Sequence, residues 1–143
     1  MEKKLLITGA SGFLGHHLCR HAVAAGHWQV FGAYRSNGIT YDGVAPVQVD
    51  ICDNAALTAL FSRVRPDAVI HAVAISQPND CAKDPVNSRT VNVDASRNIA
   101  ALCALHRCAC VFTSSDQVFD GEHAPYSEED ALAPVNVYGE QKR

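Results

Sequence analysis

Residues 4–15, KLLITGASGFLG, decide the fold of this chain. A short apolar run ends in a turn with glycines at positions 9, 12 and 15, and an apolar pattern of helical period follows the turn. A glycine-rich turn between a buried strand and a helix lets the backbone approach a pyrophosphate, which then sits on the free N–H groups of the helix N-terminus. The stretch therefore predicts a nucleotide-binding turn made of Gly9, Ser11, Gly12, Phe13, Leu14 and Gly15.

The rest of the chain alternates between two apolar periods. Continuous apolar runs, which are typical of buried strands, alternate with stretches in which the apolar residues are three and four apart, which is typical of helices. We expect strands near residues 4–8, 29–34, 46–49, 68–72 and 109–114. This alternation predicts an α/β fold, a doubly wound parallel sheet of the Rossmann type with helices on both faces, in one NAD(P)-binding domain over residues 1–143.

Three helices are expected between these strands. Gly26 ends the first, Asp53 caps the second, and the pair Asp84–Pro85 begins the third. In each helix the apolar residues fall on one face. This pattern predicts the buried stripes Leu14, Leu18, Ala22 and Ala25, then Leu57, Leu60, Phe61 and Val64, and finally Val91, Ala95, Ile99 and Leu102.

Composition and charge are those of an ordinary globular protein. Of the 143 residues, 48% are hydrophobic and 19% charged, and the net charge is −3. A nucleic-acid or anionic-membrane surface would need a basic patch, so neither partner is expected. No apolar run has the length of a membrane span, and the N-terminal stretch is a poor signal peptide. The six cysteines show no C-x-x-C spacing, which predicts reduced, mostly buried thiols of a cytoplasmic protein and no metal site.

The residue after the second strand bears on the choice of cofactor. An NAD site of this type usually has an acidic residue about 20 positions after the glycine turn, where it binds ribose hydroxyls. Here no acidic residue lies between Glu2 and Asp42, and Arg35 stands in that place. A guanidinium can grip a 2′-phosphate with two hydrogen bonds, whereas a carboxylate would repel it. The sequence therefore favours NADP(H) over NAD(H); the alternative is that Arg35 is a solvated loop residue.

A second set of polar residues follows the fifth strand. Ser114 and Ser115 lie at its end, where parallel sheets bind ligands. Tyr138 and Lys142 are four residues apart, the spacing that places two side chains on one helix face. In this interpretation Tyr138 passes a proton to a substrate carbonyl oxygen as hydride arrives from NADPH, and Ser115 orients that oxygen. Lys142 holds the nicotinamide ribose, and its charge favours the tyrosinate.

Longer motifs stand in order along the whole chain. They are TGASGFLG at 8–15, VD at 49–50, HAVA at 71–74, VNVDASRNIA at 91–100, SSDQVFDG at 114–121, YSEED at 126–130 and PVNVYGEQK at 134–142. Together they resemble the extended short-chain dehydrogenase/reductase superfamily, and most closely its dTDP-4-dehydrorhamnose reductase-like group. The resemblance implies a catalytic triad of Ser115, Tyr138 and Lys142. It also implies adenine contacts from Asp50 and Ile51 and further cofactor contacts from Ala72, Val73 and Ala74.

The same resemblance implies a function in nucleotide-sugar metabolism. Members of the group are considerably longer, so the chain is expected to be the N-terminal part of an NADP(H)-dependent reductase of a nucleotide-linked 4-keto-sugar, with a homodimer left open. Two alternatives stay open. One is an NAD-dependent nucleotide-sugar epimerase or dehydratase, and the other is a non-catalytic NADP-binding regulatory subunit like that of methionine adenosyltransferase.

The end of the chain carries an expectation of its own. The residues after Tyr138 are polar and offer no apolar stripe for docking a helix, and short helices are marginal in water. We therefore expect the segment from about Val135 onward to be frayed or held by a neighbouring molecule, and the 143-residue chain by itself to be inactive.

Overall fold

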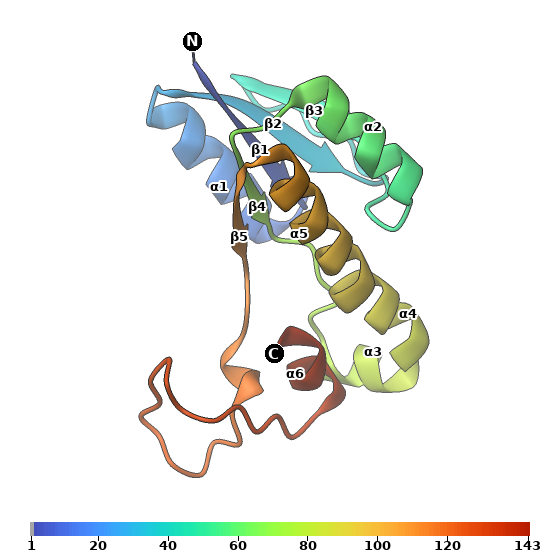
Figure 1. Cartoon of the computed structure of the whole chain (residues 1–143), viewed down its shortest axis with the longest axis vertical. Helices are drawn as coiled ribbons and strands as arrows, with labels where there is room; N and C mark the ends of the chain where they lie inside the picture. The colour runs from blue at the N-terminus through green and yellow to red at the C-terminus, as the bar shows by residue number, and fades with distance from the viewer. Residues whose placement is uncertain (1) are drawn as a thin grey trace. The chain divides into compact units, whose positions relative to one another are not determined.

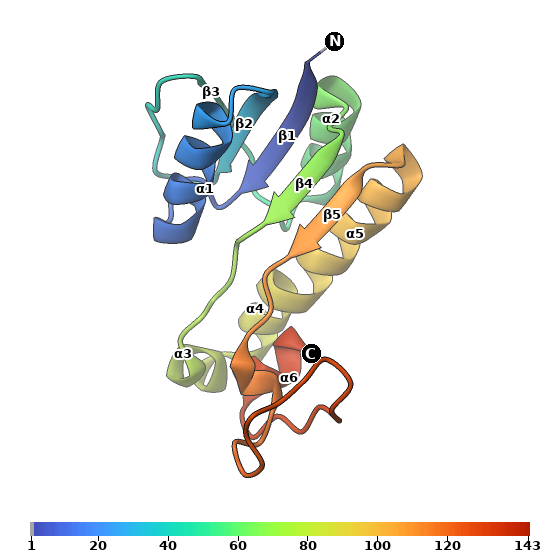
Figure 2. The ribbon, with the colours of Figure 1, turned by 90° about the vertical axis from the view of Figure 1, so that its left-hand side faces the viewer.

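The computed structural model describes residues 2–143, and the chain folds as two compact units. The first unit comprises the described residues through Val73 together with Ala95–Thr113. It contains a single parallel sheet of five strands in the order β3-β2-β1-β4-β5 (Figures 1 and 2). The strands are β1 (Lys3–Thr8), β2 (Trp28–Tyr34), β3 (Val44–Gln48), β4 (Ala68–His71) and β5 (Ala109–Phe112). The predicted doubly wound parallel sheet is confirmed, with small shifts at the strand ends.

Three helices cover this sheet on its two faces. Helix α1 (Phe13–Ala24) lies on one face, and α2 (Asn54–Val64) and α5 (Ala95–His106) lie on the other (Figure 1). Asp53 caps α2 as predicted, because its Oδ1 accepts hydrogen bonds from the backbone N–H groups of Ala55 and Ala56 at 2.9 and 3.0 Å. The predicted stripe of α2 is fully buried.

The buried face of α1 differs from the predicted one. Leu14 is 46% exposed, whereas Cys19 is completely buried. Gly15 is buried as well, since it packs against the turn before the helix. The face that meets the sheet therefore runs through Gly15, Leu18, Cys19 and Ala22, one position round from the predicted stripe.

The apolar core of the first unit centres on β1. Leu6 and Ile7 are completely buried, as is Val69 on β4, because helices cover both faces of these central strands. No helix of the described residues combines the length and the apolar character needed to cross a membrane.

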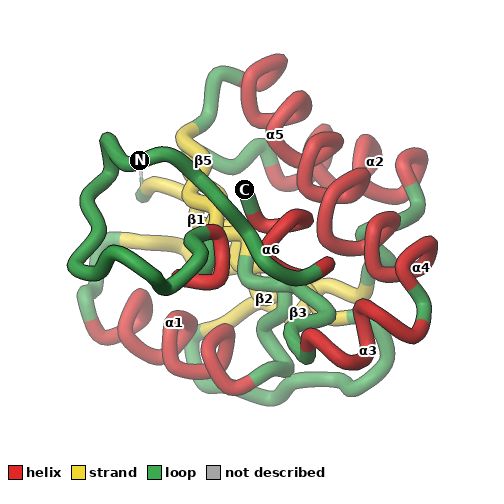
Figure 3. The backbone as a smooth tube through the Cα atoms, turned by 90° about the horizontal axis from the view of Figure 1, so that it is seen from below, coloured by secondary structure: helices red, strands yellow, loops and turns green. Residues whose placement is uncertain are grey.

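The second unit comprises Ala74–Asp94 and Ser114–Arg143. It contains short elements: α3 (Pro78–Lys83), α4 (Pro85–Arg89), the π-helical turn η1 (Thr90–Asp94), the 3-10 turn η2 (Asp116–Val118) and α6 (Val137–Lys142), with a long loop before α6 (Figure 3). Asp84 caps α4, since its Oδ1 accepts from the Asn87 N–H at 3.0 Å, and Pro85 begins that helix as predicted. The sequence pattern did not predict α3, which is too short to show an apolar stripe.

Candidate dinucleotide turn and active-site residues

The glycine turn brings the start of α1 close to the ends of β1 and β4. Gly9 has a φ of +75°, and a Cβ there would lie 3.1 Å from Val73 Cγ2 and 3.3 Å from the Ala72 carbonyl carbon. A Cβ on Gly15 would collide with the Gly9 carbonyl group and lie 2.8 Å from Ala10 Cα. Larger side chains would therefore push α1 away from the turn.

The first turn of α1 has room for an anion. Gly12 is the N-cap, and no side chain caps the helix through a hydrogen bond. In most helices a Ser, Thr, Asp or Asn at this position would occupy the N–H groups of the first turn. Ser11, Phe13 and Leu14 beside the cap are exposed. The turn therefore fits the phosphates of a dinucleotide, which bind at such helix N-termini.

A buried histidine joins the two strands that flank the glycine turn. Thr8 Oγ1 and His71 Nδ1 are hydrogen-bonded at 2.6 Å, and His71 Nε2 and Ser96 Oγ at 3.0 Å. The backbone N–H of Ala72 also donates to Thr8 Oγ1 at 3.3 Å. These bonds hold the end of β1 and the end of β4 in register directly before Gly9 and Ala72. The sequence analysis missed them, although a histidine inside an otherwise apolar strand is a signal of a specific partner.

The remaining predicted cofactor residues of the first unit lie at the carboxyl edge of its sheet. Arg35 follows β2 and is exposed, and its carbonyl oxygen accepts from Gln48 Nε2 at 3.0 Å. Neither of the ion pairs found among residues 2–143 involves the Arg35 guanidinium. Asp50 follows β3, where its exposed carboxylate accepts from the Cys52 N–H at 2.9 Å, and Ile51 beside it is buried. Ala72 and Val73 follow β4 and are half-buried.

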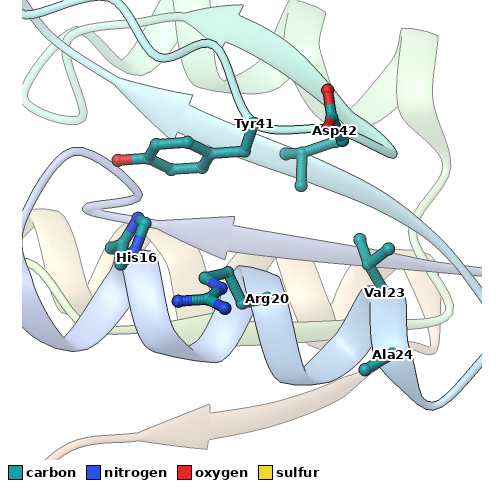
Figure 4. A pocket seen from close by; sticks show the side chains of 7 residues that line it. His16, Arg20, Val23, Ala24, Tyr41 and Asp42 are labelled. Atoms are coloured by element: carbon teal, nitrogen blue, oxygen red, sulfur yellow. The ribbon is translucent and has the colours of Figure 1, made fainter.

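A hollow of about 290 Å³ lies between α1 and the loop that precedes β3 (Figure 4). Tyr41 from that loop donates a hydrogen bond to the Ala10 carbonyl oxygen at 3.2 Å, and its ring meets the His16 ring edge-on, with 4.6 Å between centroids. The loop is thereby tied to the backbone of the glycine turn. The residues that line the hollow are His16, Arg20, Val23, Ala24, Tyr41, Asp42 and Val44.

In the second unit, Tyr138 and Lys142 lie on α6, which is a formed helix. The expectation of a frayed end from Val135 onward is therefore wrong. Asn136 caps α6 with its Oδ1, which accepts from the Gly139 N–H at 2.8 Å, and its Nδ2 donates to Gln117 Oε1 at 2.8 Å. Tyr138 is 7% exposed and Lys142 is 3% exposed.

Hydrogen bonds take the place of the apolar stripe that α6 lacks. Asn92 Nδ2 donates to Gln141 Oε1 at 2.8 Å, and Gln141 Nε2 donates to Ser88 Oγ at 2.9 Å. The Ser114 hydroxyl donates to the carbonyl oxygen of Lys142 at 3.0 Å. The sequence analysis missed Asn92, Gln141 and Ser88. An asparagine directly after Val91, beside the predicted apolar stripe, was the available signal, because a buried amide needs partners.

Ser115 and Gly139 place α6 against η2. A Cβ on Gly139 would collide with the Gln117 carbonyl oxygen and would lie 3.0 Å from Pro134 Cβ. Only a glycine allows the helix to approach so closely. Ser115 caps η2, where its Oγ accepts from the Gln117 N–H at 3.2 Å, and it lies 3.1 Å from Asp116 Oδ1.

The electrostatics of this cluster differ from the expected ones. Burial raises the pKa of Tyr138, and a hydrogen bond with Ser115 offsets part of that rise. Burial also lowers the pKa of Lys142. We expected the Lys142 charge to favour the tyrosinate, but the dominant effect on both groups is the removal of water, which disfavours their charged forms. At neutral pH Tyr138 is therefore a protonated phenol.

Comparisons with known proteins show the family of the chain and the proteins that share its fold. A family model described as RmlD substrate binding domain matches residues 3–143. Methionine adenosyltransferase 2 subunit beta of Pongo abelii is 32% identical over 142 residues, which are 99% of this chain and 41% of that protein. A probable low-salt glycan biosynthesis reductase of Haloferax volcanii is 36% identical over 138 residues, or 95% of this chain and 45% of that protein. The chain thus spans less than half the length of these curated relatives.

Solved structures share the fold. A hypothetical dTDP-4-dehydrorhamnose reductase from Sulfolobus tokodaii is 33% identical with a TM-score of 0.86, covering 97% of this chain and 49% of that one. A dTDP-4-dehydrorhamnose reductase from Bacillus anthracis in complex with NADP is 26% identical with a TM-score of 0.83, covering 99% and 47%. A UDP-glucose 4-epimerase from Brucella ovis in complex with NAD is 26% identical with a TM-score of 0.86, covering 98% and 44%.

Proposed function

Because the chain belongs to the RmlD substrate binding domain family, in the extended short-chain dehydrogenase/reductase superfamily, we propose that it is part of an NADP(H)-dependent reductase of a nucleotide-linked 4-keto-sugar. The observation that carries the proposal is the cluster on α6. Tyr138 and Lys142 are buried there, and the Ser115 hydroxyl is close enough to the Tyr138 phenol to lower its pKa in part. A serine and a tyrosine close together, with a lysine on the same helix as the tyrosine, are the groups that carbonyl reduction needs.

Each residue of the cluster has a distinct role in the proposed reaction. A bound nicotinamide dinucleotide would supply the hydride. Tyr138 would donate its phenol proton to the carbonyl oxygen of the substrate. The phenol holds this proton at neutral pH, and the raised pKa makes it a weaker acid than an ordinary tyrosine. Ser115 would hydrogen-bond the same oxygen and orient it. Lys142 would hold the ribose of the dinucleotide.

The glycine turn and the residues beyond the strand ends would hold the rest of the dinucleotide. The uncapped start of α1, with Gly9, Gly12 and Gly15, would receive the pyrophosphate. Asp50, Ile51, Ala72, Val73 and Ala74 would line the remaining contacts. Arg35 would bind a 2′-phosphate, since its guanidinium is exposed and no carboxylate pairs with it among residues 2–143. This last feature supports NADP(H) over NAD(H).

A second candidate function is favoured by a different observation. The relative from Pongo abelii is named as a subunit of an adenosyltransferase, so the same fold could serve here as a nucleotide-binding partner subunit. An NAD-dependent epimerase is the third reading, supported by the fold shared with the Brucella ovis enzyme. The intact Ser115, Tyr138 and Lys142 cluster suits both enzymatic readings.

One experiment separates the three readings. The product of the complete reading frame is assayed with NADPH and a dTDP-4-keto-sugar, with NAD and a UDP-hexose, and for binding to a methionine adenosyltransferase catalytic subunit. Consumption of NADPH that depends on the keto-sugar is the expected result. Epimerisation without net cofactor turnover, or tight subunit binding without any turnover, would contradict the reductase.

A further inference from the structure

The turn that joins α5 to β5 brings two cysteines together. Arg107 has a φ of +55°, in the left-handed region, and its N–H donates to the Ala104 carbonyl oxygen at 3.2 Å. The N–H of Cys108 donates to the Cys103 carbonyl oxygen at 2.9 Å. These two bonds form a Schellman motif, the common way to end a helix, in which the side chains at the positions of Cys103 and Cys108 usually make an apolar contact. Here that contact is made by two thiols.

A third thiol completes a cluster. The side chains of Cys108 and Cys110 are close enough to the Cys103 thiol to raise its pKa. Cys103 is 2% exposed, Cys108 is half-buried, and Cys110 on β5 is exposed. Burial, together with these neighbouring thiols, raises the pKa of Cys103 well above its ordinary value, so it stays protonated. The cluster takes no part in the proposed reduction of a keto-sugar.

We propose that Cys103 and Cys108 are a redox-active pair. Hydrogen peroxide oxidises the two thiols to a disulfide, and a thiol reductant reduces the disulfide back to two thiols. The geometry of the turn supports this pair over the others. A backbone hydrogen bond of 2.9 Å limits the distance between the two Cα atoms to about 6.8 Å, which lies within the disulfide window of about 4.4–6.8 Å.

The other pairs in the cluster fit less well. Cys108 and Cys110 are separated by one residue along an extended segment, so their Cα atoms lie roughly 6.6 Å apart, near the upper end of the window. The Cys110 side chain contributes to the raised pKa of Cys103, but no backbone hydrogen bond of the motif holds Cys110 near Cys103. The half-buried position of Cys108 leaves its sulfur within reach of a small oxidant, whereas Cys103 is enclosed.

Formation of the disulfide consumes one molecule of hydrogen peroxide. Hydrogen peroxide oxidises the Cys108 thiol to a sulfenic acid and is reduced to one water molecule. The Cys103 sulfur then attacks the Cys108 sulfur, the S–O bond breaks, and the leaving hydroxide takes the Cys103 thiol proton and becomes a second water molecule. Two thiols and one peroxide thus give one disulfide and two water molecules. Because the thiolate is the better nucleophile, the raised pKa of Cys103 makes this last step slow.

Peptide mapping tests the proposal directly, because trypsin cuts after Arg97, Arg107 and Lys142. Cys103 falls on peptide 98–107, while Cys108 and Cys110 fall together on peptide 108–142. The purified 143-residue chain is treated with hydrogen peroxide, its remaining thiols are blocked, and the digest is analysed without reduction. We expect peptides 98–107 and 108–142 to be joined, two of the six thiols to be lost, and dithiothreitol to restore both.

Two variants assign the partner of Cys103. Cys110→Ser should keep the cross-linked peptides, and Cys108→Ser should abolish them while its far-UV circular dichroism stays that of the parent. Four results would each overturn the proposal. The first is an unlinked peptide 108–142 that is two hydrogens lighter, which means a bond between Cys108 and Cys110, and the second is a cross-link that survives Cys108→Ser. The third is oxygenated cysteines on peptide 108–142 while Cys103 remains a free thiol, and the fourth is disulfides that form only between two chains. If a variant fails to fold, fragmentation of the cross-linked wild-type peptides assigns the partner of Cys103, because Cys108 is the first residue of peptide 108–142 and Cys110 is the third.

Discussion

Asn92 donates a side-chain hydrogen bond of 2.8 Å to Gln141, and this bond joins the π-helical turn η1 to α6. Gln141 is the neighbour of Lys142 in sequence and lies three residues after Tyr138. Asn92 itself is held by the backbone of Ile75, whose N–H donates to Asn92 Oδ1 at 2.8 Å and whose carbonyl accepts from Asn92 Nδ2 at 3.0 Å. The position of the proposed catalytic tyrosine therefore depends on an amide network rather than on apolar packing.

Loss of the Gln141 amide should loosen α6. Gln141→Ala removes the bonds to Asn92 and Ser88, so we expect unfolding to require about 1–3 kcal/mol less free energy. Urea denaturation followed by circular dichroism measures the change. Glu140→Ala is the matched control, because Glu140 is exposed on the same helix and an exposed substitution usually stays within about 0.5 kcal/mol. Equal effects of the two substitutions would contradict the role given to the network.

A side chain at position 139 should separate α6 from η2. The Cβ of Gly139→Ala would meet the Gln117 carbonyl oxygen, and we expect a loss of about 1–3 kcal/mol of stability from the forced backbone shift. Gly38→Ala serves as the control, because a Cβ there finds no atom closer than the Tyr34 ring at 4.0 Å. Thermal unfolding of the two variants measures the difference. A stable Gly139→Ala protein would mean that α6 and η2 pack less tightly than described.

The Tyr138 phenol should ionise at a higher pH than an ordinary tyrosine. Burial raises its pKa above the usual value of about 10, so the folded protein holds this proton over a range in which the unfolded chain has lost it. Its contribution to stability is complete below pH 10 and is lost as the pH rises through the folded pKa. We expect the tyrosinate absorbance of the wild type to continue rising at a pH where that of Tyr138→Phe has levelled off. Parallel curves would show that the phenol is not desolvated.

Arg35 should control the choice between the two dinucleotides. We expect the chain to bind NADPH more tightly than NADH, and Arg35→Asp to reverse or abolish that preference, because a carboxylate repels a 2′-phosphate. Arg63→Asp is the control. Arg63 is exposed in the last turn of α2, and a helix that runs antiparallel to the strands ends at the edge opposite their carboxyl ends. Fluorescence titration of the wild type and the two variants with NADPH and NADH measures the six affinities, and equal affinities in the wild type would reject the assignment.

Removal of the Tyr138 hydroxyl should stop the proposed reduction. In the product of the complete reading frame, Tyr138→Phe loses only the donated proton, which typically contributes about 10²–10⁴-fold in rate. We expect the rate of NADPH oxidation with a dTDP-4-keto-sugar to fall by that factor while the affinity for NADPH stays nearly unchanged. Near-normal turnover would mean that another group supplies the proton.

Much of the fold was predictable because it depends on local patterns. The period of the apolar residues locates all five strands, and Asp53 and Asp84 mark the starts of two helices through the chemistry of their own side chains. The glycine turn was predictable for the same reason, since Gly9, Gly12 and Gly15 are adjacent along the chain as well as in space. The buried stripe of α1 was predicted one position out, because Gly15 packs against the turn and rotates the face that the sheet covers.

The rest was decided by contacts between residues far apart in the sequence. The spacing of Tyr138 and Lys142 predicts a shared helix face, but nothing near them predicts that α6 is stable. Its stability comes from Asn92 and Ser88, about 50 positions earlier, and such a pairing leaves no periodic trace along the chain. The same holds for the pKa of Tyr138. A sequence shows that a lysine is close, whereas only the tertiary structure shows how much water is excluded, and here desolvation is the largest effect on the pKa of both Tyr138 and Lys142.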